Sequence, residues 1–151
     1  MPSLDTITKR FQSADRNTRL ELLLDFSERL PVLPEKYREA VAQGINQVSE
    51  CQTPVFLYPE IHEGKFMLYA DVPREAPTVR GFVALLIKAL NGAPLADVQA
   101  VPADLFDRLG LTELLGMTRT QGLSAIVGRV RRMGTSPPGP LSAMRGEGEP
   151  G

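Results

Sequence analysis

The chain contains one segment, residues 78–90, that is apolar on almost every side of a helix. A helix without a polar face is normally a central element of the core. Asn91 and Gly92 follow, and a glycine after the last helical residue is typical of a helix end. The fold is therefore expected to pack around a buried helix over 78–90. Its apolar residues are Val79, Phe82, Val83, Leu85, Leu86, Ile87 and Leu90.

Two strands are predicted before this helix. Residues 53–60 are rich in β-branched and aromatic side chains, and residues 65–72 alternate with the two-residue period of a strand. Residues 62–64 between them are expected to form a hairpin turn. Residues 45–49 predict a third, weaker strand.

Helices are predicted on both sides of the strands, and the last has a clear start signal. The sequence Thr118-Arg119-Thr120-Gln121 fits a capping box, in which the first and last residues satisfy each other's free backbone N–H groups. A brief turn at 112–115 precedes it. Helices, then a hairpin, then helices predict an α+β fold, with several α-helices packed against a small antiparallel β-sheet of two to three strands. The other predicted helices cover residues 3–13, 18–29, 34–43, 94–99 and 102–109.

The length of 151 residues suits a single domain, which we expect over residues 1–133. The composition changes after it, because nine of the eighteen residues from 134 to 151 are glycine or proline and few are apolar. Such a segment buries too little surface to offset the entropy lost on ordering. Residues 134–151 are therefore predicted to be a disordered tail.

Charge and hydropathy argue against two classes of partner. The net charge is −1, and phosphate backbones are usually bound by a basic domain, so no nucleic-acid partner is expected. Arg129, Arg131 and Arg132 form only a small cluster, in the last turns of a helix where cations complement the dipole. The strongest apolar run, 82–87, is far below the ~20 residues that span a bilayer, so no membrane segment is expected. Charged residues also interrupt the N-terminus, and a free thiol suits a reducing compartment, so a cytoplasmic protein is predicted.

Cys51 is the only cysteine of the chain. It cannot form an internal disulfide, and a structural zinc site or an iron–sulfur cluster takes about four ligands, to which the chain adds only His62. No metal site is therefore expected. A buried, inert cysteine and a thiol that acts alone as nucleophile or carrier both remain, since free cysteine is often buried. The neighbours Glu50, Gln52 and Pro54 favour a loop over a core strand.

Five sequence blocks follow one another along the chain. They are LPVLP at 30–34, CQTPVF at 51–56, VRGFVALL at 79–86, FDRLGL at 106–111 and RTQGL at 119–123. Their order and approximate spacing resemble the SufE family of sulfur-acceptor proteins. The resemblance covers residues 11 to 133 and leaves the predicted tail outside.

This resemblance implies a SufE/IscU-like fold and a role as a sulfur carrier. Proteins of the family take a sulfur atom as a persulfide from a PLP-dependent, SufS-like cysteine desulfurase, stimulate that enzyme and pass the sulfur to an Fe–S scaffold complex. By position, Cys51 would be the acceptor, and the chain would be a carrier and activator rather than an enzyme. The pyridoxal cofactor would belong to the partner, so this chain is expected to bind no cofactor. Family analogy also implies a monomer.

The further candidate site residues are Arg119, Asp71 and Gln52. Arg119 and Asp71 match family positions, and Arg119 would lie near the Cys51 loop, where it stabilises thiolate or persulfide charge or pairs with Asp71. The alternative is a solvated arginine that opposes the helix dipole by about 0.3–1 kcal/mol. Gln52 would offer its amide to the sulfur or to the partner's backbone, and a loop amide bonded to water is its alternative.

Two positions depart from the family pattern. The family usually has glycine before the acceptor cysteine and tryptophan in the following strand, where this chain has Glu50 and Phe56. A carboxylate beside the thiol is expected to raise the pKa of Cys51 and removes the backbone freedom of glycine. Because persulfides are lost to reductants and oxidants, we expect Val55, Phe56 and the helix over 78–90 to cover the thiol until a partner docks.

Two other functions stay open from the residues alone. A cysteine-nucleophile hydrolase or transferase usually pairs its thiol with a histidine base, and this chain has only His62, a predicted surface residue of the hairpin turn. An interaction domain with an inert cysteine is the other. Alanine at His62 would inactivate a hydrolase but not a carrier, and thiol labelling of the native protein would identify an inert core cysteine.

Overall fold

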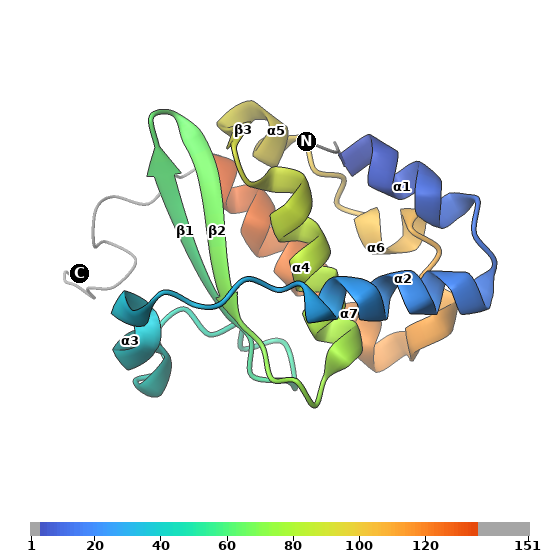
Figure 1. The fold of residues 1–151 in the computed structure, drawn as a ribbon, viewed down its shortest axis with the longest axis horizontal. Coiled ribbons are helices and arrows are strands. Elements are labelled where there is room, and N and C mark those ends of the chain that lie inside the picture. Colours follow the sequence, from blue (N-terminus) through green and yellow to red (C-terminus); the bar gives the residue numbers. More distant parts are fainter. Residues whose placement is uncertain (1–3, 136–151) are drawn as a thin grey trace.

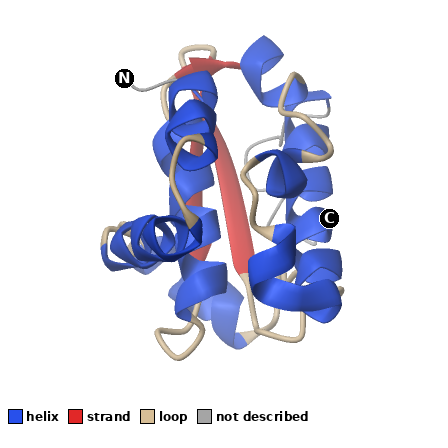
Figure 2. Cartoon of the chain, turned by 90° about the vertical axis from the view of Figure 1, so that its right-hand side faces the viewer, coloured by secondary structure: helices blue, strands red, loops and turns tan. Residues whose placement is uncertain are grey.

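The computed structural model describes residues 4–135, which form an α+β fold with a three-stranded antiparallel sheet of order β1-β2-β3 (Figure 1). The predicted fold class is confirmed. Figure 2 shows the strands in the interior of the molecule, with helices on both sides. The elements are α1 (Leu4–Gln12), α2 (Arg16–Glu28), the 3-10 helix η1 (Glu35–Tyr37), α3 (Arg38–Ala42), β1 (Phe56–His62), β2 (Lys65–Asp71), α4 (Pro77–Leu90), β3 (Ala93–Pro94), α5 (Leu95–Gln99), α6 (Leu105–Arg108) and α7 (Thr112–Thr135).

Helix α4 is the central element, as its apolar sequence predicts. Most of its side chains are buried, and it packs against both α2 and β2. Gly81 allows α2 to come close, because a Cβ at this position would lie 2.1 Å from the backbone oxygen of Leu23. Phe82 meets Phe106 of α6 edge to face, with ring centroids 5.6 Å apart. Helices α1, α2 and α6 thus pack around α4.

Strands β1 and β2 form the predicted hairpin, with a shorter turn. His62 pairs with Lys65, so the turn consists of Glu63 and Gly64, whose φ angles are 54° and 79°. Two-residue turns with positive φ at both positions match the twist of the strands. The first strand is displaced from the predicted 53–60 to Phe56–His62, because the residues before it close the Cys51 loop.

The third strand is β3, and the prediction of a strand over 45–49 is wrong. That segment contributes a single bridge, between Gln47 and Phe56. Asn46 has a φ of 64°, and this left-handed conformation interrupts an extended backbone. β3 comes instead from Ala93–Pro94, next to the predicted helix over 94–99.

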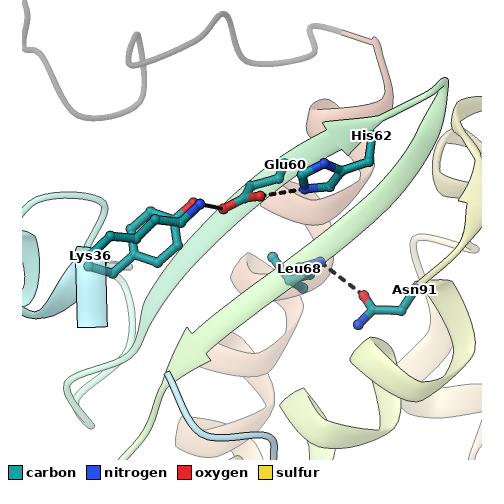
Figure 3. Close-up of polar contacts among 6 residues, drawn as sticks. Lys36, Glu60, His62, Leu68 and Asn91 are labelled. Atoms are coloured by element: carbon teal, nitrogen blue, oxygen red, sulfur yellow. Dashed lines mark hydrogen bonds and ion pairs between the residues drawn. The ribbon is translucent and has the colours of Figure 1, made fainter. Parts of the chain in front are cut away.

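The side chain of Asn91 hydrogen-bonds to β2 beyond the part of that strand that pairs with β3. Its Oδ1 accepts a hydrogen bond of 2.9 Å from the backbone N–H of Leu68 (Figure 3). An amide side chain here satisfies a strand donor that would otherwise be unpaired at a sheet edge. Asn91 therefore does more than end α4, which is the role the sequence predicts for it.

The outer face of the sheet is covered by the segment around η1 and α3. Tyr37 stacks on Tyr58 with ring centroids 4.5 Å apart, and Glu60 accepts a hydrogen bond from the Tyr37 hydroxyl. Glu60 also lies 2.7 Å from Lys36 Nζ and 2.5 Å from His62 Nε2 (Figure 3). Burial acts to raise the pKa of Glu60, but hydrogen bonds from Lys36, Tyr37 and His62 lower it overall. His62 is exposed, as predicted, and serves to hold this carboxylate.

The start of α2 differs from the predicted one, whereas the turn predicted before the last helix is present. α2 begins at Arg16 rather than at Thr18, because the Asp15 side chain accepts a hydrogen bond of 2.8 Å from Thr18 N and caps the helix. α7 begins at Thr112, but Gly116, with φ of 81° and ψ of 170°, is not helical, so residues 112–115 form a short turn ahead of the main helix, in agreement with the prediction. The side chain of Thr118 lies outside the described residues, and the capping box stays a prediction.

The structure describes the end of α7 but not the two chain ends. α7 continues through Thr135, so the first two residues of the predicted tail are helical. Residues 1–3 and 136–151 are outside the described residues, and the disorder predicted for the tail stays a prediction. Within residues 4–135, none of the helices has both the length and the apolar character that crossing a bilayer requires.

Candidate functional site

Cys51 lies in the loop between α3 and β1. Figure 1 shows this loop near the N-terminal end of α4, and Val79 of that helix lines a cavity together with Cys51. Two backbone hydrogen bonds close this loop, from Val48 N to Val55 O at 2.8 Å and from Cys51 N to Val48 O at 3.2 Å. The side chains of Val48 and Val55 are fully buried and anchor both ends of the loop in the core. Cys51 itself is half-buried. The predicted loop position of Cys51 is confirmed.

The thiol borders a small cavity of about 70 Å³. Ligand pockets for small molecules usually measure about 300–1,000 Å³, whereas one water molecule takes up about 30 Å³ of the liquid. The cavity thus has room for an added atom or two but not for a substrate molecule. It is lined by Cys51, Gln52, Thr53, Val79, Arg119 and Gly122.

Gly122 of α7 lies directly against Cys51. A Cβ at position 122 would be 3.2 Å from Cys51 Sγ and 3.3 Å from Cys51 Cα. Ordinary contacts between heavy atoms lie at about 3.5–4.0 Å. Because Gly122 has no side chain, the Cys51 loop can pack directly against α7.

Replacing Gly122 with alanine is expected to displace this loop and to raise the rate at which a maleimide labels Cys51 several-fold. The added methyl group would meet both the sulfur and the backbone of the loop, which is easier to move than α7. Gly128→Ala is the matched control, since a Cβ there meets only the flexible Arg132 side chain, at 3.4 Å. Equal labelling rates in the two variants would contradict the contact.

Arg119 lines the same cavity and therefore lies near the Cys51 loop, as expected. Its Nη1 donates a hydrogen bond of 2.5 Å to Thr78 Oγ1, at the start of α4. The guanidinium acts to lower the pKa of Cys51 by its charge. The bond to Thr78 therefore holds a cation at the rim of the Cys51 cavity.

Asp71 is not brought into this cavity. No ion pair joins Asp71 to Arg119 among the described residues, and Asp71 instead acts on Tyr58 and Arg80. Burial raises the pKa of Tyr58 to about 12, with the charge of Asp71 contributing. The pairing of Asp71 with Arg119, one of two roles considered for Arg119, is thus absent from this arrangement.

Arg80 is a positioning residue that sequence reasoning missed. Its Nε donates to Ser27 O at 2.9 Å and its Nη1 to Val72 O at 2.6 Å, so it ties α4 to the end of α2 and to the chain after β2. Burial lowers the pKa of Arg80. The sequence does carry a signal for Arg80, because it is a charged residue within a mostly apolar helical segment. Arg80 fixes the end of α4 that carries Val79 to the Cys51 cavity.

The pKa of Cys51 is raised, as expected, but the cause is not the expected one. Burial raises its pKa, while a hydrogen bond from the Thr53 backbone and the charge of Arg119 lower it in part. Glu50, expected to raise this pKa, points away, with its Oε1 3.5 Å from Arg129 Nη2. Only the attribution to Glu50 was wrong, because this ion pair holds the carboxylate toward α7.

The cover over Cys51 comes only in part from the predicted residues. Val79 of α4 and Gly122 of α7 border the thiol, in agreement with the expected role of the helix over 78–90. Phe56 packs instead on the outer face of the sheet with Tyr37. Successive side chains of a strand alternate between its faces, so Phe56, the first residue of β1, is on the same face as Tyr58.

The arrangement lacks the partner that a cysteine hydrolase needs. His62 bonds to Glu60 and is not among the described residues that line the Cys51 cavity. Within residues 4–135, no group of three or more His, Cys, Asp or Glu side chains is placed to hold a metal ion. What the geometry offers is one half-buried thiol, a neighbouring cation and space for an added atom.

Comparison with known proteins identifies the family. Residues 5–133 match the SufE family, described as an Fe–S metabolism associated domain. An uncharacterized SufE-like protein of Mycobacterium tuberculosis is 36% identical over 130 residues, which cover 85% of this chain and 89% of that protein. The sulfur acceptor protein CsdE of Escherichia coli is 36% identical over 106 residues, or 69% of this chain and 68% of CsdE.

A solved structure agrees with this match. The solution structure of a hypothetical protein from Thermus thermophilus superposes with a TM-score of 0.76 at 32% sequence identity, over 87% of this chain and 93% of that one. The family match spans the described fold and includes the Cys51 loop, Arg119 and Gly122 within residues 5–133. The chain therefore belongs to the SufE family, whose domain is associated with Fe–S metabolism.

Proposed function

We propose that this chain accepts a sulfur atom on Cys51 from a PLP-dependent cysteine desulfurase and passes it on for iron–sulfur cluster assembly. One observation carries the proposal: the lone thiol of a SufE-family chain borders a cavity large enough for an added atom, with Arg119 at its rim. The sulfur-acceptor name of CsdE and the cysteine-desulfuration name of the Plasmodium falciparum relative support this role.

The transfer step needs only a thiolate and a persulfide. The Cys51 thiolate attacks the outer sulfur of the desulfurase persulfide, a new S–S bond forms on Cys51, and the desulfurase cysteine leaves as a thiolate. No external oxidant or reductant is consumed, because one S–S bond replaces another. The charge of Arg119 stabilises the anionic forms of Cys51 before and after transfer.

Onward transfer follows from the cysteine count. With no second thiol in the chain, the persulfide cannot close to an internal disulfide, so its sulfur leaves to another molecule. We infer that an Fe–S scaffold complex receives it and that the chain works as a monomer. Removing the product sulfur frees the desulfurase for its next turnover, which would make this chain an activator without catalytic turnover of its own.

Mass spectrometry tests the proposal directly. After incubation with a SufS-like desulfurase and cysteine, the peptide that contains Cys51 is expected to gain the mass of one sulfur atom, and a reductant should remove it. Omitting the desulfurase is the control. An unmodified Cys51 peptide after this incubation would refute the proposal.

Replacing Arg119 with alanine is expected to slow sulfur acceptance several-fold without unfolding the protein. Without the cation, the pKa of Cys51 rises further, so the thiolate forms only at higher pH. The rate of alkylation by iodoacetamide against pH should therefore move to higher pH in Arg119→Ala and stay near the wild-type profile in Arg119→Lys. Overlapping profiles for all three proteins would remove Arg119 from the site.

A further inference from the structure

A second hollow lies between the edge of β1 and the C-terminal half of α7. Its volume is about 320 Å³, which is within the range of binding pockets. Its surface combines apolar side chains with two guanidinium groups, and none of its lining residues is acidic. The lining residues are Asn46, Leu57, Pro59, Arg129, Arg132 and Met133.

The two arginines of this hollow carry more positive charge than their neighbours compensate. Arg129 pairs with the Glu50 carboxylate at 3.5 Å, and that carboxylate is 54% exposed. Arg132 is exposed and makes no ion pair within residues 4–135. Two guanidinium groups thus share one carboxylate, at a distance and exposure where ion pairs are weak and exchangeable. The hollow is suited to a second carboxylate.

The hollow and the Cys51 cavity lie along the same side of α7. Gly122 borders the cavity and Arg129 borders the hollow, and a separation of seven residues places both on one helix face, about 10 Å apart. Glu50, which pairs with Arg129 of the hollow, immediately precedes Cys51 in the chain. A protein that delivers sulfur to Cys51 must approach this face.

We propose that this hollow is a docking site for an acidic segment of the cysteine desulfurase. A carboxylate of the segment would pair with Arg132 and compete with Glu50 for Arg129, and an adjacent apolar side chain would pack on the partly exposed Met133. Competition for Arg129 would also loosen the tie between Glu50 and α7, next to the acceptor cysteine. This inference rests on the proposed function, because it takes the desulfurase as the partner.

A charge reversal at the exposed end of the hollow tests the docking site. The dissociation constant of the full chain for the desulfurase is measured for wild type, Arg132→Glu, Arg132→Lys and Arg16→Glu. Arg16→Glu is the matched control, since Arg16 is an exposed arginine at the start of α2 and the change in charge is the same. Circular dichroism verifies that each variant is folded.

Arg132→Glu is expected to weaken binding about tenfold at low salt, with the difference shrinking as salt screens the charges. Arg132→Lys and Arg16→Glu should stay within about twofold of wild type, because the charge at the hollow is kept. Equal affinities of Arg132→Glu and Arg16→Glu would overturn the proposal.

A peptide probe tests the acidic character of the occupant. Hexaglutamate is expected to compete with the desulfurase for wild type, whereas hexaglutamine should not, and failure of hexaglutamate to compete would count against an acidic segment. The two proposals fail separately. The mass of the wild-type Cys51 peptide decides sulfur acceptance, whereas the affinity of Arg132→Glu decides docking.

Discussion

Replacing Cys51 with serine is expected to abolish both sulfur acceptance and stimulation of the desulfurase while the fold stays intact. A serine hydroxyl is not a thiolate and forms no persulfide, so the chain would have nowhere to place the sulfur. The change replaces one half-buried atom in a loop whose ends are held by Val48 and Val55. Desulfurase turnover, measured as sulfide or alanine release, should fall to its rate without this chain.

His62→Ala is the informative companion to this variant. His62 bonds to Glu60 on the outer face of the sheet, so its loss should leave sulfur acceptance near the wild-type level. A cysteine–histidine hydrolase would lose activity in both variants. Stimulation of the desulfurase that persists in Cys51→Ser at the wild-type level would show that Cys51 is not the acceptor.

Replacing Gly81 with alanine is expected to destabilise the protein more than any other substitution considered for this chain. The new Cβ would lie 2.1 Å from Leu23 O and 2.9 Å from Leu23 C, which are backbone atoms that no rotamer change can move aside. Helix α2 would have to shift from α4, and overpacking of a core costs about 1–3 kcal/mol or more. We expect about 3 kcal/mol less stability and a fall in Tm on the order of 10 °C.

Gly128→Ala is the control for this prediction, because it makes the same change in a helix where space is available. The nearest atom to a Cβ at position 128 belongs to the flexible Arg132 side chain, 3.4 Å away. Alanine is a better helix former than glycine by about 1 kcal/mol, so Gly128→Ala should be as stable as wild type or more stable. Chemical denaturation of both variants measures the difference, and equal stability would contradict the close contact of α2 and α4.

Much of the fold could be predicted because the signals are local. The all-round apolar character of 78–90 identified the central helix, and the alternation of 65–72 identified β2. The errors came where a backbone conformation or a distant pairing decides the structure. Asn46, with φ of 64°, prevents a strand over 45–49, and β3 exists only because residues 93–94 pair with β2.

The sequence identified most residues of the candidate site but not the contacts they make. Arg119 and Gln52 do line the Cys51 cavity, whereas Asp71 does not. The direction of Glu50 could not be predicted, since Arg129 is 79 positions away in the chain and meets it only after α7 packs beside the loop. The same holds for Arg80, whose acceptors are backbone carbonyls that the sequence does not reveal.

By itself, the sequence determined that one thiol is present, that it sits in a loop before a hairpin, and that an apolar helix organises the core. These features depend on residue type and on periods of two to four residues. Only the tertiary structure decided that Val79, Arg119 and Gly122 surround the sulfur and that burial raises the pKa of Cys51. The reason is that packing of α4 and α7 against the loop sets both the neighbours of the thiol and its access to water, and neither can be read from adjacent residues.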